Sequence, residues 1–287
     1  MLELGSHMSA AGGCDLALTR AADCEMTSCQ LFTKNERQWN AKPLDPAMVE
    51  RYFVQREATG ITQVVAHDSY LINLASPDDA LWIKSREALK EELRRCDALG
   101  IVGLVSHPGA HVGSGVDAGI GRIVEAINRV VDEMPDGTSV LLLETTAGQG
   151  TVLGRSFEEL AQIIAGIEDP SRVGVCLDTC HIFAAGYDIR DEVSYTSTIA
   201  AFDDIVGLDR LRCIHLNDSQ KGVGMHVDRH AHIGEGEIGT AAFGFLLNDP
   251  RLDGLIGILE TPKGSDATED RMNLATLRGL VPPIPPA

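Results

Sequence analysis

The sequence predicts a (β/α)8 barrel, an α/β fold in which eight parallel strands alternate with helices around a closed cylinder. Short, continuously apolar runs recur along the chain at intervals of roughly 35 to 45 residues, as expected of strands buried on both faces. Segments with helical spacing of apolar side chains lie between several of these runs. The length of 287 residues suits eight such units in a single domain.

The predicted strands account for the fold class. Two early strands are expected near residues 2–6 and 30–34. Six later strands are expected at the apolar runs 61–66, 101–106, 140–143, 173–177, 211–214 and 255–259. A doubly wound open sheet shows the same alternation of strand and helix, so it stands as the alternative. We expect one barrel domain over residues 1–280, followed by a proline-rich tail over 281–287 that cannot continue a helix.

Three helices have clear sequence signals. One carries apolar residues at positions 89, 93 and 96 and is expected to end at Gly100. A second has an apolar stripe at positions 120, 124, 127 and 131. A third is expected to begin at a capping box formed by Ser156 and Glu159.

Composition limits the classes of partner and compartment. The chain has 24 Lys and Arg against 42 Asp and Glu, a net charge of −18, which ordinarily counts against nucleic-acid binding. Bound divalent cations can reverse that expectation within one cleft. No run approaches the roughly 18 apolar residues that a membrane span needs, and no signal-peptide pattern opens the chain, so we expect a cytoplasmic protein without a membrane partner. Seven cysteines without CxxC spacing are expected to be reduced and to serve mainly in packing.

The residue directly after each later apolar run is a type that binds divalent metals. These residues are His67, His107, Glu144, Asp178, His215 and Glu260. A single His or Asp at a strand end more often caps a loop than binds a metal. Six in six runs favour ligands, because the carboxyl ends of barrel strands meet at one mouth, where such enzymes build their sites.

Two local pairs extend this set. Asp178 and His181 lie three residues apart at a strand-to-helix turn, and Asp228 and His230 lie two apart, on one side of an extended backbone. The nine candidates, five His and four carboxylates, are too many for one zinc ion and indicate two or three ions with a bridging carboxylate. The histidines favour zinc, with manganese as an alternative, over calcium or magnesium. Cys180 lies within one pair, and we expect it to pack against the barrel.

An ion cluster without a separate nucleophile indicates phosphoester hydrolysis. Paired ions lower the pKa of a bound water and neutralise charge on a phosphoryl oxygen and its leaving group. The chain has no P-loop and no GxGxxG motif, and the glycine pairs 148/150 and 234/236 are interpreted as tight turns at the barrel mouth.

Several long blocks, in order, resemble the endonuclease IV family of apurinic/apyrimidinic endonucleases. They start at residues 7, 31, 67, 107, 144, 173, 215 and 227, and they include HMSAAGG, LFTKNERQW, HDSYLINL, HPG, ETTAGQG, VGVCLDTCHIFAAGY, HLND and VDRH. The resemblance implies a TIM barrel that holds three zinc ions and cleaves DNA 5′ to an abasic site, leaving a 3′-hydroxyl and a 5′-deoxyribose phosphate. A hydroxide between the first two ions would be the nucleophile, and a 3′-repair diesterase activity could accompany cleavage.

The resemblance also assigns residues. His67 and His107 would bind the first ion, which shares Glu144 with the second. Asp178, His215 and Glu260 would complete the second site, so that Glu144, Asp178 and Glu260 form its catalytic carboxylates. His181, Asp228 and His230 would bind the third ion. Arg37, Tyr70 and Leu71 would contact DNA and fill the gap left by the extruded abasic nucleotide; without the resemblance, Arg37 is more simply a solvated loop residue and Tyr70 and Leu71 more simply core.

Some positions depart from the family pattern. Met225 and His226 stand where relatives commonly have a small residue followed by Arg, and Thr145 replaces a frequent Asn. The proline-rich tail replaces a helical end. These differences concern DNA affinity and the terminus rather than the metal ligands. His7 belongs to a matching block and is expected at the barrel mouth, whereas His111, His226 and His232 are interpreted as loop residues.

Two other functions fit parts of the pattern. A metal-dependent sugar isomerase or epimerase uses the same barrel with one or two ions, for which the pair Asp228 and His230 is surplus. A DNA-damage-binding protein without activity would have no need of nine ligands. The expected partner is therefore double-stranded DNA with abasic sites, bound by a monomer.

Overall fold

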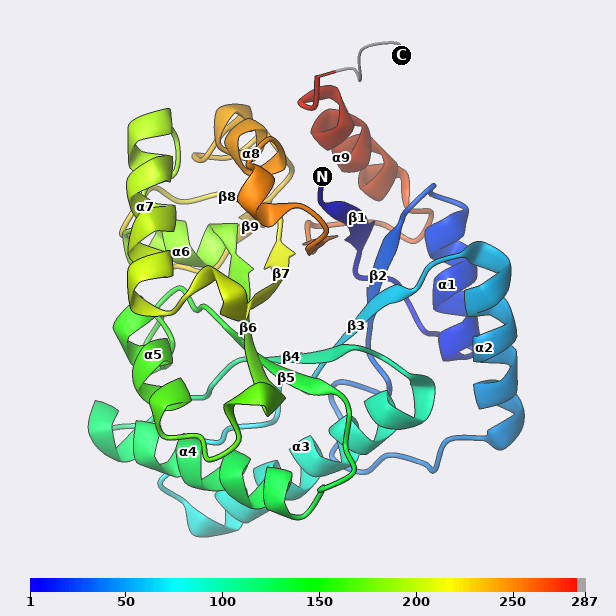
Figure 1. Ribbon diagram of the computed structural model, residues 1–287, viewed down its shortest axis with the longest axis vertical. Helices are drawn as coiled ribbons and strands as arrows, with labels where there is room; N and C mark the ends of the chain where they lie inside the picture. Colours follow the sequence, from blue (N-terminus) through cyan, green and yellow to red (C-terminus); the bar gives the residue numbers. More distant parts are fainter. Residues whose placement is uncertain (283–287) are drawn as a thin grey trace.

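The computed structural model describes residues 1–282 and forms a barrel of parallel strands surrounded by helices (Figure 1). The sheet order is β1-β10-β7-β6-β5-β4-β3-β2, and neighbouring strands in this order run parallel. The predicted barrel is therefore confirmed, and the open doubly wound sheet is excluded. The strands are β1 (Glu3–Ser6), β2 (Ser28–Leu31), β3 (Gln63–His67), β4 (Gly103–Ser106), β5 (Val140–Glu144), β6 (Val173–Asp178), β7 (Leu211–His215) and β10 (Ile256–Leu259).

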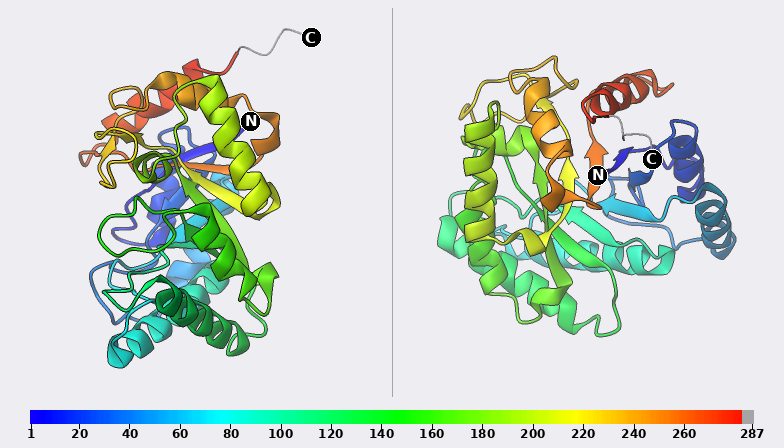
Figure 2. Two further views of the ribbon diagram at one scale, coloured as in Figure 1. Left: turned by 90° about the vertical axis from the view of Figure 1, so that its left-hand side faces the viewer. Right: turned by 45° about the horizontal axis from the view of Figure 1, so that its top comes forward.

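Nine α-helices lie within residues 1–282, and most of them surround the strands as an outer layer (Figure 2). They are α1 (Cys14–Ala22), α2 (Pro46–Thr59), α3 (Asp79–Leu99), α4 (Val116–Asp132), α5 (Phe157–Ala165), α6 (Thr179–Ala185), α7 (Glu192–Ile205), α8 (Thr240–Leu247) and α9 (Thr268–Gly279). Three 3-10 turns, η1 (Pro170–Arg172), η2 (Leu208–Arg210) and η3 (Pro250–Leu252), precede strands β6, β7 and β10. Within the same range, no helix is long and apolar enough to cross a membrane.

The three predicted helices form, with two differences of detail. Gly100 ends α3 in the left-handed conformation, with φ of 62°. In α4 the buried stripe runs through Ile123 and Val130 rather than through Val124 and Val131, which are only half-buried. The Ser156 hydroxyl caps α5 by accepting from the Glu159 N–H, but the Glu159 carboxylate accepts from Gly154 and Arg155 rather than from Ser156.

The second strand was placed wrongly by two to three residues. It spans Ser28–Leu31 rather than 30–34, because Ser28 and Gln30 are fully buried despite their polarity. Ser28 is accommodated by donating its hydroxyl proton to the Glu3 carbonyl. The proline-rich tail was expected over 281–287, and from residue 283 onward it lies outside the described residues.

The barrel closes where β1 meets β2. A parallel bridge joins His7 to Gln30, and the Met8 N–H donates to the Gln30 carbonyl at 2.7 Å. The two strands approach so closely that a Cβ on Gly5 would lie 2.1 Å from the Ser28 carbonyl oxygen. Glycine at position 5 is therefore a requirement of barrel closure.

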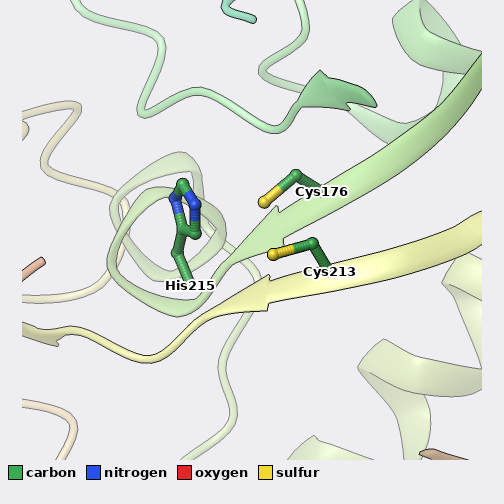
Figure 3. Close-up of side chains that lie close together, drawn as sticks. All are labelled: Cys176, Cys213 and His215. Atoms are coloured by element: carbon green, nitrogen blue, oxygen red, sulfur yellow. The ribbon is translucent and has the colours of Figure 1, made fainter. Parts of the chain in front are cut away.

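Two apolar layers hold the fold together. The larger cluster packs the helices against the outside of the barrel, and a small cluster fills its interior. The interior cluster comprises Val65, Val105, Leu142, Cys176, Cys213, Ile256 and Ile258. Cys176 and Cys213 are register partners on β6 and β7, and their thiols lie close to the His215 ring (Figure 3). All seven cysteines are free and buried, as predicted.

Candidate metal centre

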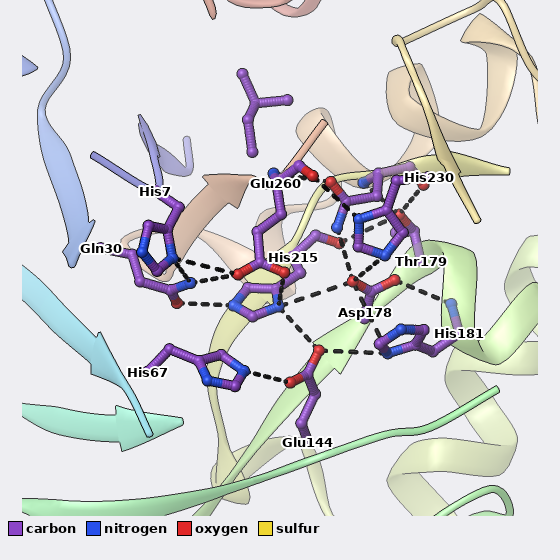
Figure 4. Close-up of polar contacts among 12 residues, drawn as sticks. His7, Gln30, His67, Glu144, Asp178, Thr179, His181, His215, His230 and Glu260 are labelled. Atoms are coloured by element: carbon purple, nitrogen blue, oxygen red, sulfur yellow. Dashed lines mark hydrogen bonds and ion pairs between the residues drawn. The ribbon is translucent and has the colours of Figure 1, made fainter. Parts of the chain in front are cut away.

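The six predicted strand-end residues meet at one end of the barrel, and all of them except His107 are labelled in Figure 4. His67, Glu144, Asp178 and His215 are the last residues of β3, β5, β6 and β7, whereas His107 and Glu260 directly follow β4 and β10. The parallel strands bring them together because all eight strands end at the same rim. Glu144, Asp178 and His215 are fully buried, so their charges are shielded from water.

Glu144 lies at the centre of the cluster, and its two oxygens face different neighbours. Oε2 lies 3.2 Å from His67 Nε2 and 3.0 Å from His107 Nε2. Oε1 lies 3.0 Å from His215 Nδ1 and 3.3 Å from His181 Nδ1. This is the arrangement expected of a carboxylate that bridges two cations.

His215 is the centre of a second group. Its Nδ1 lies 3.2 Å from Glu260 Oε2 and 3.7 Å from Asp178 Oδ2, in addition to its approach to Glu144. Ligand atoms of these four residues all lie within 4.8 Å of one another. The group has the size of a site for one ion with one nitrogen and three carboxylates.

A third group is formed by a segment that the strand pattern does not reveal. A short antiparallel hairpin, β8 (Asp218–Ser219) with β9 (His230–Ala231), carries Asp228 and His230 back over the mouth. Asp228 Oδ2 lies 3.2 Å from His181 Nε2, and Oδ1 lies 3.3 Å from His230 Nε2. Asp178 is the last residue of β6 and caps α6 by accepting from the His181 N–H, which aims the His181 ring at this group.

The hydrogen bonds of four imidazoles determine which ring nitrogen faces the cluster. Each donates one ring N–H to a carbonyl oxygen, which can only accept, so the other nitrogen carries a lone pair when the ring is neutral. The donors and acceptors are His67 Nδ1 to Asp68 O, His181 Nδ1 to Thr145 O, His230 Nδ1 to Glu260 O, and His215 Nε2 to Gln30 Oε1, at 2.9, 2.8, 3.1 and 2.8 Å. Four lone pairs therefore point at carboxylates, an arrangement that a cation between them stabilises.

Two of these nitrogens are the plainest evidence that the residues fit a metal. His181 Nε2 and His230 Nε2 are buried, and within residues 1–282 neither has a hydrogen-bond partner. A buried polar atom without a partner costs free energy unless something binds it. Both lie near Asp228, so an ion at that point would satisfy all three side chains.

The ionised carboxylates of the cluster require balancing positive charge. Burial lowers the pKa of His67, but its hydrogen bond to Glu144 and the charge of Glu144 outweigh burial and raise that pKa to about 9. Burial raises the pKa of Glu144, but His107 and His215 outweigh it and hold the pKa well below its usual range. Burial likewise raises the pKa of Asp228, but its contact with His181 outweighs burial and lowers that pKa to about 2. These carboxylates are thus held ionised, and either protons on the imidazoles or divalent cations supply the balancing charge.

Several residues that support the ligands carry no sequence signal of that role. The Asn217 side chain donates to Asp178 Oδ2 at 2.7 Å and accepts from the Glu260 N–H at 2.8 Å. The Thr145 hydroxyl accepts from the Asp178 N–H at 2.9 Å. Gln30 contacts His7, His215 and Glu260 together. Asn217 lies two residues after His215, the last residue of β7, and this position is the one feature of the sequence that points to its supporting role.

Comparison with known proteins places the chain in a family. A family model described as "Xylose isomerase-like TIM barrel" matches residues 18–278. A relative from Chloroflexus aurantiacus, named probable endonuclease 4, is 54% identical over 281 residues, which cover 98% of this chain and 99% of the relative. The chain belongs to the endonuclease IV family. As a member of that family it is a nuclease, as the sequence predicted.

Solved structures agree with this placement. Endonuclease IV from Thermus thermophilus superposes with a TM-score of 0.87 at 38% identity, covering 97% of this chain and 98% of that one. A D-tagatose 3-epimerase-like protein superposes with a TM-score of 0.73 at 18% identity, covering 97% and 98% of the two chains. The second likeness shows a shared barrel fold only.

The residues expected to contact DNA, Arg37, Tyr70 and Leu71, lie in loops, and the Tyr70 ring lies 5.9 Å from the ring of the candidate ligand His67. The Arg37 side chain is 83% exposed and approaches Glu36 at 3.4 Å. Tyr70 is 67% exposed, so it is not a core residue, and its ring packs edge-on against Phe32. The Ser69 hydroxyl donates to the Glu36 carbonyl at 2.6 Å and so ties the two loops together. Leu71 is half-buried.

Met225 and His226 are two positions that depart from the endonuclease IV pattern. Met225 is 59% exposed, and the His226 ring donates to the Ala147 carbonyl at 3.1 Å.

Other residues near the mouth were also assigned roles from the sequence. Cys180 is buried, and its thiol lies within 4.8 Å of ligand atoms of Asp228 and His230. Gly148, Gly150 and Gly234 have positive φ, as expected of tight turns, whereas Gly236 does not. His111 accepts from loop N–H groups of Gly113 and Gly115, which agrees with its interpretation as a loop residue.

Proposed function

We propose that this chain hydrolyses the phosphodiester bond 5′ to an abasic site in double-stranded DNA, leaving a 3′-hydroxyl and a 5′-deoxyribose phosphate. The observation that carries the proposal is the convergence of nine imidazole and carboxylate side chains at one barrel mouth, with their free nitrogens aimed at carboxylate oxygens. Membership of the endonuclease IV family supports the choice of DNA over other phosphoesters.

The proposed cofactor is zinc, three ions per chain, with manganese as an alternative at one site. His67, His107 and Glu144 would hold the first ion, Glu144, Asp178, His215 and Glu260 the second, and His181, Asp228 and His230 the third. Five neutral imidazoles suit zinc better than magnesium or calcium. When bound, such ions lower the pKa of a bound water and neutralise charge on the scissile phosphate.

The chain's own groups would position these events. Neighbouring histidines hold Glu144 and Glu260 ionised, so these carboxylates are ready to bind cations without first losing a proton, and Asn217 orients Asp178. Two hollows flank the cluster. One, of about 280 Å³, is lined in part by His107, His181 and Asp228, and the other, of about 650 Å³, by His7, Lys34 and Lys263. An extruded sugar-phosphate would approach the cluster through these hollows.

The exposed loops would provide the DNA contacts. We propose that Arg37, Tyr70 and Leu71 fill the gap left by the extruded nucleotide, because a sugar without a base loses no stacking when it leaves the helix. Tyr70 is exposed yet held edge-on to Phe32, so it can stack on a base pair without first being ordered. The protein would act as a monomer.

The test is incubation of zinc-loaded protein with a duplex that has one abasic site, read on a sequencing gel. The proposal predicts a single cut on the 5′ side with a 3′-hydroxyl product, and a matched duplex without the lesion stays intact. A duplex with a blocked 3′ end, run in parallel, measures 3′-repair diesterase activity. A panel of ketohexoses serves as the counter-assay, since epimerisation of a sugar without DNA cleavage would contradict the proposal.

A further inference from the structure

The two strands that carry no predicted metal ligand nevertheless meet the cluster. β1 and β2 form the seam of the barrel, where His7 and Gln30 are bridged residues. Gln30 is fully buried on β2, and its side chain points toward the ligands of the second group rather than toward solvent (Figure 4). A buried amide requires partners for both its oxygen and its nitrogen.

The single amide of Gln30 reaches three side chains. Its Oε1 lies 2.8 Å from His215 Nε2. Its Nε2 donates to Glu260 Oε1 and lies 2.9 Å from His7 Nδ1. Both hydrogens of the nitrogen and a lone pair of the oxygen are therefore used, and two of the three partners are ligands of the proposed second ion.

Chemistry determines the orientation of this amide. The Glu260 carboxylate can only accept, so the Gln30 nitrogen must face it and the Gln30 oxygen must face His215. An amide oxygen can only accept, so His215 must carry its proton on Nε2. The remaining nitrogen, Nδ1, is then left with its lone pair toward Glu144, Asp178 and Glu260.

His7 holds the amide from the opposite side. Its Nδ1 accepts from Gln30 and lies 3.6 Å from Glu260 Oε1, and its ring packs against Phe32 with centroids 4.3 Å apart. The ring is thus held by its packing against Phe32, at an interplanar angle of 52°, as well as by the barrel seam. His7 and Glu260 together engage both hydrogens of the Gln30 nitrogen.

We propose that Gln30 is the positioning residue of the second ion's site. Its amide holds His215 in the tautomer that binds metal through Nδ1 and holds Glu260 in place, while His7 fixes the amide. This inference rests on the proposed function for the identity of the ion. Groups that orient metal ligands in this way typically change metal affinity by about 10- to 100-fold when they are removed.

The experiment compares Gln30→Met with wild type and with Gln63→Met. Methionine keeps the volume and removes both hydrogen-bonding groups. Gln63 opens β3 at the opposite end of the barrel, so its variant controls for loss of a glutamine from a strand. Zinc occupancy is measured by elemental analysis across buffered free-zinc concentrations, with thermal unfolding to verify the fold.

In Gln30→Met we expect one of three ions to bind about 10- to 100-fold more weakly and the other two to bind as in wild type. Excess zinc should restore cleavage, because the chemistry itself is intact. Nitrogen-15 spectra of metal-free protein, recorded at a pH high enough for His215 to be neutral, should show His215 protonated on Nε2 in wild type and a mixture of tautomers in the variant. His7→Phe, which keeps an aromatic ring against Phe32 and removes the acceptor, should give the same pattern more weakly.

Equal affinity for all three ions in Gln30→Met would overturn the inference, as would a uniform loss of all three, which indicates a purely structural role. Failure of the proposed function is distinguishable. Wild-type protein that binds three zinc ions but leaves abasic DNA intact would refute the proposed function, while a selective loss of one ion in Gln30→Met would still support the role of Gln30.

Discussion

Replacing the bridging carboxylate in two ways tests the shared ligand directly. Glu144→Gln keeps one oxygen and turns the other into an amide nitrogen, which cannot bind a cation. Glu144→Ala removes both. Because Oε2 faces His67 and His107 whereas Oε1 faces His215, the structure assigns one oxygen to each of the first two sites.

The expected metal content follows from that division. We expect about three ions per wild-type chain and about two in Glu144→Ala, because the first site then keeps only two protein ligands while the second keeps three, and zinc sites use three or four. Glu144→Gln should lie between these values, because its one remaining oxygen can still serve a single site. Loss of one ion of a pair removes several kcal/mol of charge stabilisation. At about 1.4 kcal/mol per factor of ten, a loss of about 4 kcal/mol lowers kcat by about 1000-fold.

The assay pairs elemental analysis with single-turnover cleavage of an abasic duplex on the same preparations. Asp249→Asn is the matched control, because Asp249 is a buried carboxylate that binds Tyr195 and Arg251 at the other end of the barrel, directly before η3. It should lower stability and leave the metal content unchanged. Full metal content or near-wild-type cleavage in Glu144→Ala would refute the shared-ligand reasoning.

Three further predictions concern other parts of the molecule. Arg37→Ala and Tyr70→Ala should each weaken binding of abasic duplex by about tenfold, as expected for loss of one stacking or phosphate contact, with metal content unchanged. Binding is measured by fluorescence anisotropy and metal content by elemental analysis; loss of zinc in either variant would show a structural role instead. The zinc-induced rise in Tm should grow from about pH 6 to about pH 8.5. The pKa of His67 is raised to about 9, so its protonated ring stabilises the metal-free fold fully below the unfolded pKa of 6.5, and this stabilisation is lost as the pH rises toward 9. Protons therefore compete with zinc most at low pH. A zinc-induced rise in Tm that shrinks as the pH rises would contradict this prediction. Asp218→Asn should lower the free energy of unfolding by about 4 kcal/mol, because its buried carboxylate accepts from the backbone of Ser219, Gly234, Gly236, Ile238 and Gly239; denaturant unfolding that matches wild type would show that the loop does not depend on it.

The barrel could be predicted because its signals are local. A buried strand of a parallel sheet reads as a continuous apolar run, and the residue after it must face the mouth, so His67, Glu144 and His215 were visible as candidate ligands without any structure. β2 was misplaced for the opposite reason. Ser28 and Gln30 are polar residues buried inside a strand, where partners distant in sequence satisfy them.

The supporting residues could not be predicted because their roles depend on contacts across the barrel. Gln30 meets Glu260 across 230 positions of sequence, and Thr145 serves Asp178 through a hydroxyl that could equally have faced solvent. The hairpin of β8 and β9 is two residues long on each side, too short for any periodic pattern. Asp228 and His230 were therefore recognised by their residue types and spacing, while their position over the mouth is a finding of the structure.

The most direct test of the central claim is the location of bound ions in crystals of zinc-loaded protein, by anomalous scattering on both sides of the zinc absorption edge. We predict three zinc peaks: one among His67, His107 and Glu144, one among Glu144, Asp178, His215 and Glu260, and one among His181, Asp228 and His230. A single peak, or a map without a peak beside Asp228, would contradict the three-ion centre.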